Sequence, residues 1–323
     1  MEKPNVVVIG KLPDSIIGKI ERKAQLKIWD KPEKISQDKL NSWLENAEGL
    51  ISRGDIYVDN ELINQSPKLR VIAQSSVGYD NINIEDCTKH SIPFGNTPEV
   101  LNNATADLIF GLLLSSARKI HEGYELIKNG NWKSSFDVPL GVDLFQKTLG
   151  IVGMGSIGGN LVKRAQSSGM NVIYHNRKKN SRNEKMGASY VTFEEILEQS
   201  DFLVVLVPLT FETKGLFGKN EFAKMKETAY FLNVSRGPIV NTNDLYYALL
   251  NEEIAYAALD VTDPEPIPSN HPLINLNNIL ITPHIGSATI ETRTRMADLT
   301  ADNLLAGLER KPLLTCVNES VNY

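Results

Sequence analysis

The stretch Thr148-Leu149-Gly150-Ile151-Val152-Gly153-Met154-Gly155-Ser156-Ile157-Gly158 lies near the middle of the 323-residue chain and decides its fold. An apolar strand runs directly into a glycine loop, and a helix predicted over residues 157–168 follows the loop. In such a unit Gly153 permits the tight turn, Gly155 lets the backbone approach a pyrophosphate, and Gly158 lets the helix pack closely on the strand. The pattern therefore predicts a dinucleotide site.

The residues that open this helix, Ser156 and Ile157, complete the predicted site. The first turn of a helix has N–H groups without a partner in the helix, and its dipole is positive at that end. We expect both residues to face the phosphates of the dinucleotide.

Outward from the loop, short runs of Val, Ile and Leu alternate with helical stretches along most of the chain. These runs are continuously apolar, which is typical of parallel strands buried on both faces. The clearest predicted strands span residues 6–10, 49–52, 71–74, 148–152, 171–175, 202–207, 229–234, 255–261 and 278–282. The alternation predicts an α/β fold with doubly wound, Rossmann-like sheets.

The central position of the loop predicts two domains, because a complete α/β series precedes it. A long helix is predicted over residues 101–130 and could cross between the domains, and a last helix is predicted over residues 289–310. We expect a coenzyme domain over residues 101–284, inserted into a substrate domain formed by residues 1–100 and 285–323.

Composition excludes several classes of function. The net charge is −5 with both signs interspersed, so no basic stripe suggests nucleic acid as a partner. The longest apolar run, residues 108–114, is far shorter than the roughly 20 residues that span a bilayer. With only two cysteines, Cys87 and Cys316, and no signal-peptide pattern at the N-terminus, we expect a cytoplasmic protein without disulfides or membrane association.

The turn after the second strand of the dinucleotide unit bears on the choice of cofactor. Sites that prefer NAD carry Asp or Glu roughly 20 residues beyond the loop, where the carboxylate binds the ribose and repels a 2′-phosphate. This chain has Asn176-Arg177-Lys178-Lys179 there instead. Asn176 does not repel a phosphate and Arg177 can bind one with two hydrogen bonds, so the turn 176–179, including Lys178, favours NADPH, with NADH possible. The alternative is a solvated basic turn.

Three residues that follow buried strands suggest chemistry on a carbonyl. Hydride transfer to a ketone needs a cation, a proton donor, and a partner that favours the donor's charged form. Arg236, Glu265 and His284 supply these types, since a carboxylate beside a histidine favours the protonated ring. Each alone has a structural explanation, as a carbonyl cap, an exposed turn acid and a structural histidine. No group of His, Cys and carboxylates has metal-ligand spacing, so no metal is expected.

Four motifs, at residues 152–158, 233–237, 259–266 and 283–288, occur in this order and spacing in the D-isomer-specific 2-hydroxyacid dehydrogenase family. The chain resembles that family over essentially its whole length. It is most similar to the glyoxylate/hydroxypyruvate reductase and 2-ketogluconate reductase branch, and its Tyr174-His175-Asn176-Arg177 ending resembles members that use NADPH.

The resemblance implies a role for each matching residue. His284 would be the proton donor, paired with Glu265, and Arg236 would bind the carboxylate of a 2-oxo acid. Implied cofactor contacts, besides the loop and the basic turn, are Thr105, Val207, Pro208, Thr210, Val234, Asp260 and Gly286. Implied substrate contacts, besides Arg236 and His284, are Arg53, Val77 and Gly78. The family is usually dimeric through the coenzyme domain, so a homodimer is expected.

The leading prediction is thus NADPH-dependent reduction of small 2-oxo acids, such as glyoxylate and hydroxypyruvate, to D-2-hydroxy acids. Within enzymes, 2-ketogluconate reductase and 3-phosphoglycerate dehydrogenase remain alternatives. A phosphorylated substrate would want a further cation, for which Arg53 is the only obvious candidate. A non-catalytic, dinucleotide-sensing interaction protein is the alternative outside enzymes.

Overall fold

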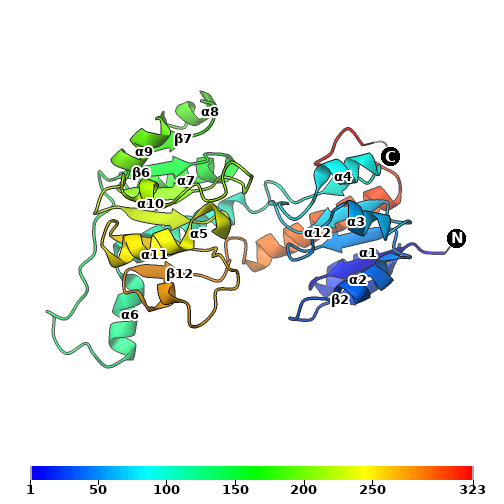
Figure 1. The fold of residues 1–323 in the computed structure, drawn as a ribbon, viewed down its shortest axis with the longest axis horizontal. Helices are drawn as coiled ribbons and strands as arrows, with labels where there is room; N and C mark the ends of the chain where they lie inside the picture. Colours follow the sequence, from blue (N-terminus) through cyan, green and yellow to red (C-terminus); the bar gives the residue numbers. More distant parts are fainter. Residues whose placement is uncertain (1, 180, 322–323) are drawn as a thin grey trace. The chain divides into compact units, whose positions relative to one another are not determined.

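The computed structural model describes residues 2–179 and 181–321, and the chain divides into two compact units. Unit 1 consists of Met1–Leu101 and Ala288–Tyr323, and unit 2 of Asn102–Ser287. Each unit is built on one parallel sheet with helices on both faces (Figure 1). The predicted α/β fold with two doubly wound sheets is therefore confirmed.

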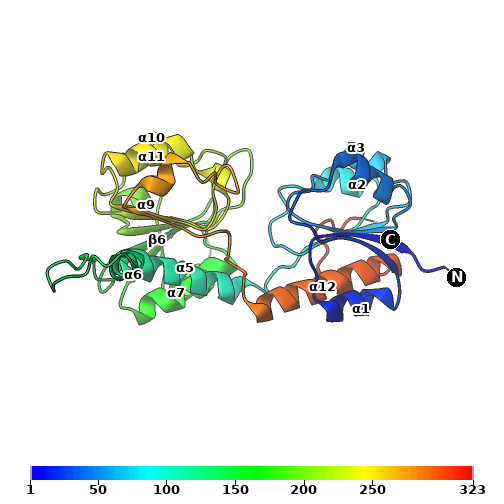
Figure 2. The same cartoon turned by 90° about the horizontal axis from the view of Figure 1, so that it is seen from below.

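Unit 1 carries a five-stranded sheet in the order β2-β1-β3-β4-β5. Its elements are β1 (Asn5–Ile9), α1 (Asp14–Glu21), β2 (Gln25–Trp29), α2 (Gln37–Leu44), β3 (Gly49–Ser52), α3 (Asn60–Asn64), β4 (Val71–Gln74), α4 (Ile84–Lys89), β5 (Phe94–Gly95) and α12 (Ile290–Leu308). Figure 2 shows α1 and α12 on one face of the sheet and α2 and α3 on the other. Along β1, Val6 and Val8 belong to the core under α12, while Val7 and Ile9 belong to the core under α2. Both faces are covered, so the strand is apolar at successive positions.

Unit 2 carries a seven-stranded sheet in the order β12-β11-β10-β9-β6-β7-β8. Its strands are β6 (Thr148–Val152), β7 (Asn171–His175), β8 (Ser189–Tyr190), β9 (Phe202–Val205), β10 (Tyr230–Asn233), β11 (Tyr256–Leu259) and β12 (Ile279–Ile281). Its helices are α5 (Asn102–Ala117), α6 (Ile120–Lys128), α7 (Ser156–Ser167), α8 (Ser181–Lys185), α9 (Phe193–Gln199), α10 (Lys219–Phe222) and α11 (Thr242–Leu250), with 3₁₀ turns η1 (Gly237–Ile239) and η2 (Pro272–Asn275). Helices α5 and α7 cover one face, and α9, α10 and α11 the other (Figure 2).

The strand order of unit 2 places its ligand site. From β6 the chain goes to β7 on one side, and later strands add on the other side, beginning with β9. The order thus reverses at β6, and in open α/β sheets ligands bind at the carboxyl ends of the strands beside such a reversal. The glycine loop, which directly follows β6, lies at this point.

The predicted helix over residues 101–130 is wrong as a single element. It is divided into α5 and α6, and both belong to unit 2. Lys119 between them has a backbone φ of +53° in the left-handed region, which ends the helical ladder. The carbonyl of Ala117 accepts a hydrogen bond from Val142 N at 2.7 Å, so the segment after α6 folds back onto the break.

Candidate active site

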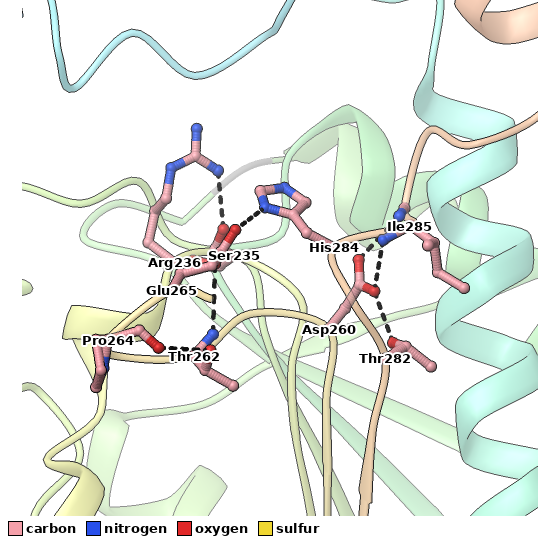
Figure 3. A network of polar contacts seen from close by, with 10 residues as sticks. Ser235, Arg236, Asp260, Thr262, Pro264, Glu265, Thr282, His284 and Ile285 are labelled. Carbon is pink, nitrogen blue, oxygen red and sulfur yellow. Dashed lines mark hydrogen bonds and ion pairs between the residues drawn. The ribbon is translucent and has the colours of Figure 1, made fainter. Parts of the chain in front are cut away.

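Three neighbouring strands carry the predicted catalytic side chains. Arg236 follows β10, Glu265 lies in the loop after β11, and His284 lies just beyond β12. The strands are adjacent and parallel, so their carboxyl ends meet at one edge of the sheet. Figure 3 shows the three side chains gathered at this edge.

His284 and Glu265 form a direct pair. Nδ1 of His284 lies 2.7 Å from Oε1 of Glu265, and the side chains are 47% and 41% exposed, respectively. A carboxylate only accepts hydrogen bonds, so Nδ1 carries the proton of this bond. Nε2, the other ring nitrogen, is left as the atom that can serve a ligand.

The electrostatics of the pair favour an ionised Glu265. Burial alone would raise the pKa of the carboxyl, but the hydrogen bond and charge of His284, the Thr262 N–H and the charge of Arg236 together lower it. The carboxylate therefore keeps its charge below its ordinary pKa of 4.5. A permanent anion beside the ring stabilises the imidazolium form that a proton donor needs.

A buried amide that sequence reasoning gave no role shapes the turn that carries Arg236. Asn233, 1% exposed, donates from Nδ2 to the carbonyl of Arg236 at 3.0 Å and accepts from Ser235 N at 3.1 Å. The backbone of Gly237, the residue after Arg236, packs against the carbonyl of Thr262, and a Cβ on Gly237 would collide with that carbonyl. The turn after β10 and the loop after β11 are thus locked together. The sequence signal for this role is that Asn233 is a polar residue at the end of an otherwise apolar strand.

The loop after His284 is held by Asp260 and Thr105, two predicted cofactor contacts. Asp260 is 1% exposed and accepts hydrogen bonds from Thr282 Oγ1 at 2.6 Å and from Ile285 N and Gly286 N at 2.8 Å each. Thr105, on α5, donates to the carbonyl of Gly286 at 3.1 Å. Both side chains are therefore engaged in positioning the residues next to His284.

The glycine loop has the geometry that a dinucleotide requires. Gly153 has a φ of +92°, and a Cβ there would lie 2.7 Å from the backbone nitrogen of Val207. A Cβ on Gly158 would meet Met154 and Ile151, so this glycine allows the close approach of α7 to β6. At Gly155 a Cβ would meet nothing within 4 Å, so the space above the loop is open where a pyrophosphate would approach. The residues fit the group.

The basic turn beside the loop divides into two parts. The side chain of Asn176 faces the glycine loop, with Oδ1 accepting from Met154 N at 2.7 Å and Nδ2 donating to Met154 O at 3.1 Å. Arg177 and Lys178 are exposed, and Lys179 pairs with Glu184 at 2.8 Å. All three cations within residues 176–179 are thus exposed to solvent, and Lys179 is in addition engaged by Glu184.

The remaining predicted cofactor contacts lie near the loop in unit 2. Val207, Pro208 and Thr210 follow β9, the strand next to β6, and Ser235 Oγ donates to the carbonyl of Val207 at 2.5 Å. Val234 is half-buried at the end of β10. The hydroxyl of Thr210 donates to Glu212 at 2.7 Å.

The predicted substrate residues Arg53, Val77 and Gly78 belong to unit 1. Two amides support them, of buried Gln74 and half-buried Asn81: Gln74 Nε2 donates to the carbonyl of Gly78 at 3.0 Å and to Asn81 Oδ1 at 3.0 Å. Asn81 Nδ2 in turn donates to the carbonyl of Arg53 at 3.2 Å. The ends of β3 and β4 are therefore tied together through these two amides, which sequence reasoning did not single out.

Membrane-spanning helices and clustered metal ligands are both absent from the described residues, 2–179 and 181–321. No helix there is both long and apolar enough to cross a membrane. No three or more His, Cys, Asp or Glu side chains there are grouped as metal ligands.

Comparison with known proteins places the chain in a family. Residues 110–286 match the family described as "D-isomer specific 2-hydroxyacid dehydrogenase, NAD binding domain". A glyoxylate reductase of Thermococcus litoralis is 43% identical over 326 residues, covering 99% of this chain and 98% of the relative. The chain belongs to the D-isomer specific 2-hydroxyacid dehydrogenases.

Solved structures of similar proteins agree with the fold. A protein of Thermus thermophilus superposes with a TM-score of 0.92 at 39% identity, covering 97% of this chain and 99% of that one. A second solved structure is described as an NADPH-dependent glyoxylate/hydroxypyruvate reductase of Sinorhizobium meliloti in complex with NADP and malonate. It superposes with a TM-score of 0.87 at 28% identity, covering 99% of this chain and 98% of that one. This dehydrogenase is therefore an oxidoreductase with a nicotinamide dinucleotide site in unit 2, as predicted.

Proposed function

We propose that this dehydrogenase reduces small 2-oxo acids, glyoxylate and hydroxypyruvate, to D-2-hydroxy acids with NADPH. The observation that carries the proposal is the His284–Glu265 pair at 2.7 Å, gathered with Arg236 at the edge of the sheet that also bears the glycine loop. These are the groups that a ketone reduction needs, at the place where open sheets bind ligands.

Each of the three residues has one role in the proposed reaction. Arg236 binds the substrate carboxylate and, through its charge, polarises the neighbouring 2-oxo group. His284 gives a proton from Nε2 to the carbonyl oxygen as that oxygen becomes an alcohol, and Glu265 stabilises the ring before the proton leaves. When bound, the reduced nicotinamide supplies the hydride to the 2-oxo carbon.

We assign further residues to the binding of substrate and cofactor. We assign unit 1 as the substrate domain, with Arg53 and the backbone at Val77 and Gly78 as further binders of the acid. Unit 2 is the coenzyme domain, with Val207, Pro208, Thr210 and Val234 lining the cofactor. The hydrogen bonds of Thr105 and Asp260 to Gly286 support a role in shaping that lining.

The preference for NADPH rests on Arg177 and Lys178. Both are exposed, beside an Asn176 that carries no charge to repel a 2′-phosphate. The related Sinorhizobium meliloti protein is titled NADPH-dependent. One carboxylate opposes the preference: the pKa of Glu212 is lowered by Thr210, by its own backbone and by the charge of Arg177, so it keeps a negative charge that acts on that guanidinium. The proposal therefore includes some use of NADH.

A homodimer in the cytoplasm completes the proposal. Among the described residues, nine of the eighteen exposed large apolar side chains fall within residues 120–145 of unit 2. A surface of this kind favours a protein partner, and a second copy is the partner that the family resemblance suggests.

Turnover with a panel of 2-oxo acids and both cofactors tests the proposal. We expect kcat/KM to be highest for glyoxylate or hydroxypyruvate with NADPH, and His284→Ala to lower kcat by about 10²- to 10⁴-fold because the proton donor is lost. NADPH binding, followed by its fluorescence, should be unchanged in the variant.

Three other outcomes would redirect the assignment. A larger kcat/KM for 2-ketogluconate, or for 3-phosphohydroxypyruvate in the reductive direction, would identify one of the alternative substrates. Equal or better use of NADH would contradict the cofactor preference. Binding of NADPH without turnover of any 2-oxo acid would contradict the proposed reaction.

A further inference from the structure

The contact between Asn176 and the glycine loop has a consequence for the cofactor site. β6 and β7 pair in parallel up to Val152 and His175, and Gly153 N then donates to the carbonyl of His175 at 2.9 Å. One residue further on, the main chains separate, since Gly153 turns into the loop with a φ of +92°. At this position the side chain of Asn176 replaces the main chain in the pairing.

The replacement satisfies both backbone groups of Met154. The amide of Asn176 accepts from Met154 N at 2.7 Å and donates to Met154 O at 3.1 Å, as a neighbouring strand would. Met154 is 1% exposed and packs in the core beneath α5 and α7. The residue between the two loop glycines is therefore fixed on both sides, by its side chain in the core and by Asn176 on its backbone.

Only an amide side chain of this length can make both bonds. An aspartate would keep the acceptor for Met154 N but would place a carboxylate oxygen where Nδ2 now donates, 3.1 Å from a carbonyl oxygen. An alanine would leave both groups of Met154 without this partner. The identity of residue 176 therefore acts on the shape of the glycine loop.

We infer that Asn176 is a positioning residue of the glycine loop, acting on the pyrophosphate subsite through Met154, and not the reader of the adenosine ribose. The inference rests on the proposed cofactor site at this loop. Selection of the 2′-phosphate then rests on the exposed cations of the same turn, first of all Arg177 and Lys178. In this chain a carboxylate at position 176 would lose the hydrogen bond to the carbonyl of Met154, so we expect it to disturb the loop that both cofactors use.

Binding of cofactor fragments separates the two roles. ADP-ribose contains the pyrophosphate, whereas adenosine 2′-monophosphate contains the adenosine ribose and the 2′-phosphate without a pyrophosphate. We expect Asn176→Ala to weaken ADP-ribose binding about tenfold, since two hydrogen bonds are lost, and to change adenosine 2′-monophosphate binding by less than about twofold. Dissociation constants come from displacement of NADPH fluorescence.

Arg177→Gln is the matched control, from the same turn. It should give the opposite pattern, weakening adenosine 2′-monophosphate while leaving ADP-ribose unchanged. Binding of ADP-ribose to the wild-type chain tests the cofactor site itself, and the difference between wild type and variant tests Asn176. Amide hydrogen exchange at residues 153–155 should also become faster in Asn176→Ala, with no ligand present.

Asn176→Asp provides a test that does not depend on removing the side chain. We expect it to bind NADH more weakly than the wild type does. Tighter NADH binding in this variant, or equal loss of both fragments in Asn176→Ala, would overturn the inference and make Asn176 a direct contact of the ribose.

Discussion

His284 has a backbone φ of +53°, in the left-handed region that residues with a side chain rarely adopt. Strain of this kind persists only where the surroundings determine the conformation. Here the N–H of His284 donates to the carbonyl of Thr282 at 3.0 Å, and buried Asp260 accepts from the two N–H groups that follow. The ring is thereby directed at Glu265 by the backbone itself.

Replacing Glu265 by Gln tests how much of the activity depends on the anion. The amide has the same length and can still accept from Nδ1, so the variant changes charge more than geometry. We expect kcat to fall by about 10- to 100-fold, because the imidazolium form of His284 loses its stabilising charge. The dissociation constant of NADPH, measured by fluorescence, should stay the same.

The pH profile of the same pair gives a second readout. The pKa of Glu265 is lowered, so the midpoint at which its charge is lost lies below pH 4.5. Any acid limb of kcat that disappears in Glu265→Gln should therefore lie below pH 4.5. A limb above pH 4.5 that is removed by the substitution would show that the carboxyl is not stabilised as an anion.

Arg236, Glu265 and His284 could be selected from the sequence because each follows a buried strand, and parallel strands bring their carboxyl ends together. The sequence did not show which backbone groups the polar side chains at the strand ends would bond. Asn233 and Asn176 both bond backbone groups of turns, and nothing in their spacing says which turn. Such bonds depend on how the main chain bends after a strand, which local sequence does not specify.

At the scale of the elements, the strongly apolar strands were predicted within a few residues, and the errors have physical causes. β2 was missed because it is an edge strand whose residues Gln25, Leu26 and Lys27 are not fully buried, so it lacks the continuous apolar run of its neighbours. The two-residue strands β5 and β8 are too short for any periodicity. The break between α5 and α6 depends on a tertiary hydrogen bond from Val142.

The packing of α12 on the sheet of unit 1 makes a prediction about stability. A Cβ on Gly307 would lie 2.6 Å from Cβ of Val71 on β4, so the helix must move away from the strand. We expect Gly307→Ala to lower the free energy of unfolding by about 1–3 kcal/mol, measured by urea denaturation.

Gly18→Ala on α1 is the control for that substitution. A Cβ there meets nothing within 4 Å, so the variant should be unchanged or more stable by about 0.5–1 kcal/mol, since alanine favours a helix. Equal effects of the two substitutions would show that the contact between Gly307 and Val71 does not limit the packing of α12.

For the whole molecule, most of the predicted domain organisation followed from the position of the glycine loop. A glycine loop at residue 153 leaves room for a complete α/β unit before it, and the helix after the last strand was therefore expected to return to that first unit. α12 does pack on the sheet of unit 1, against β3 and β4. Preference among 2-oxo acids was not accessible in this way, because it depends on a few side chains from different loops.

The surface at residues 120–145 bears on the assembly of the whole molecule. Ile120, Tyr124 and Ile127 recur at helical spacing along one face of α6, and each is at least 57% exposed. No residue of α6 is buried within its own unit. The segment after it carries further exposed apolar side chains, with Phe136 95% and Leu140 87% exposed. An isologous contact between two copies would cover this surface on both.

Charge placed on this surface should therefore separate the proposed dimer. We expect Ile120→Glu combined with Ile127→Glu to raise the dissociation constant of the dimer by at least about a hundredfold, because two carboxylates per chain would be buried without a partner. Light scattering on a size-exclusion column, over a dilution series, should give the mass of two chains for the wild type and of one for the variant.

Ile290→Glu is the matched control, since Ile290 is 85% exposed and lies outside residues 120–145, so it should leave the mass at two chains. A wild type with the mass of one chain at every concentration, or a dimer that survives both glutamates, would contradict the assignment of this surface to a second copy.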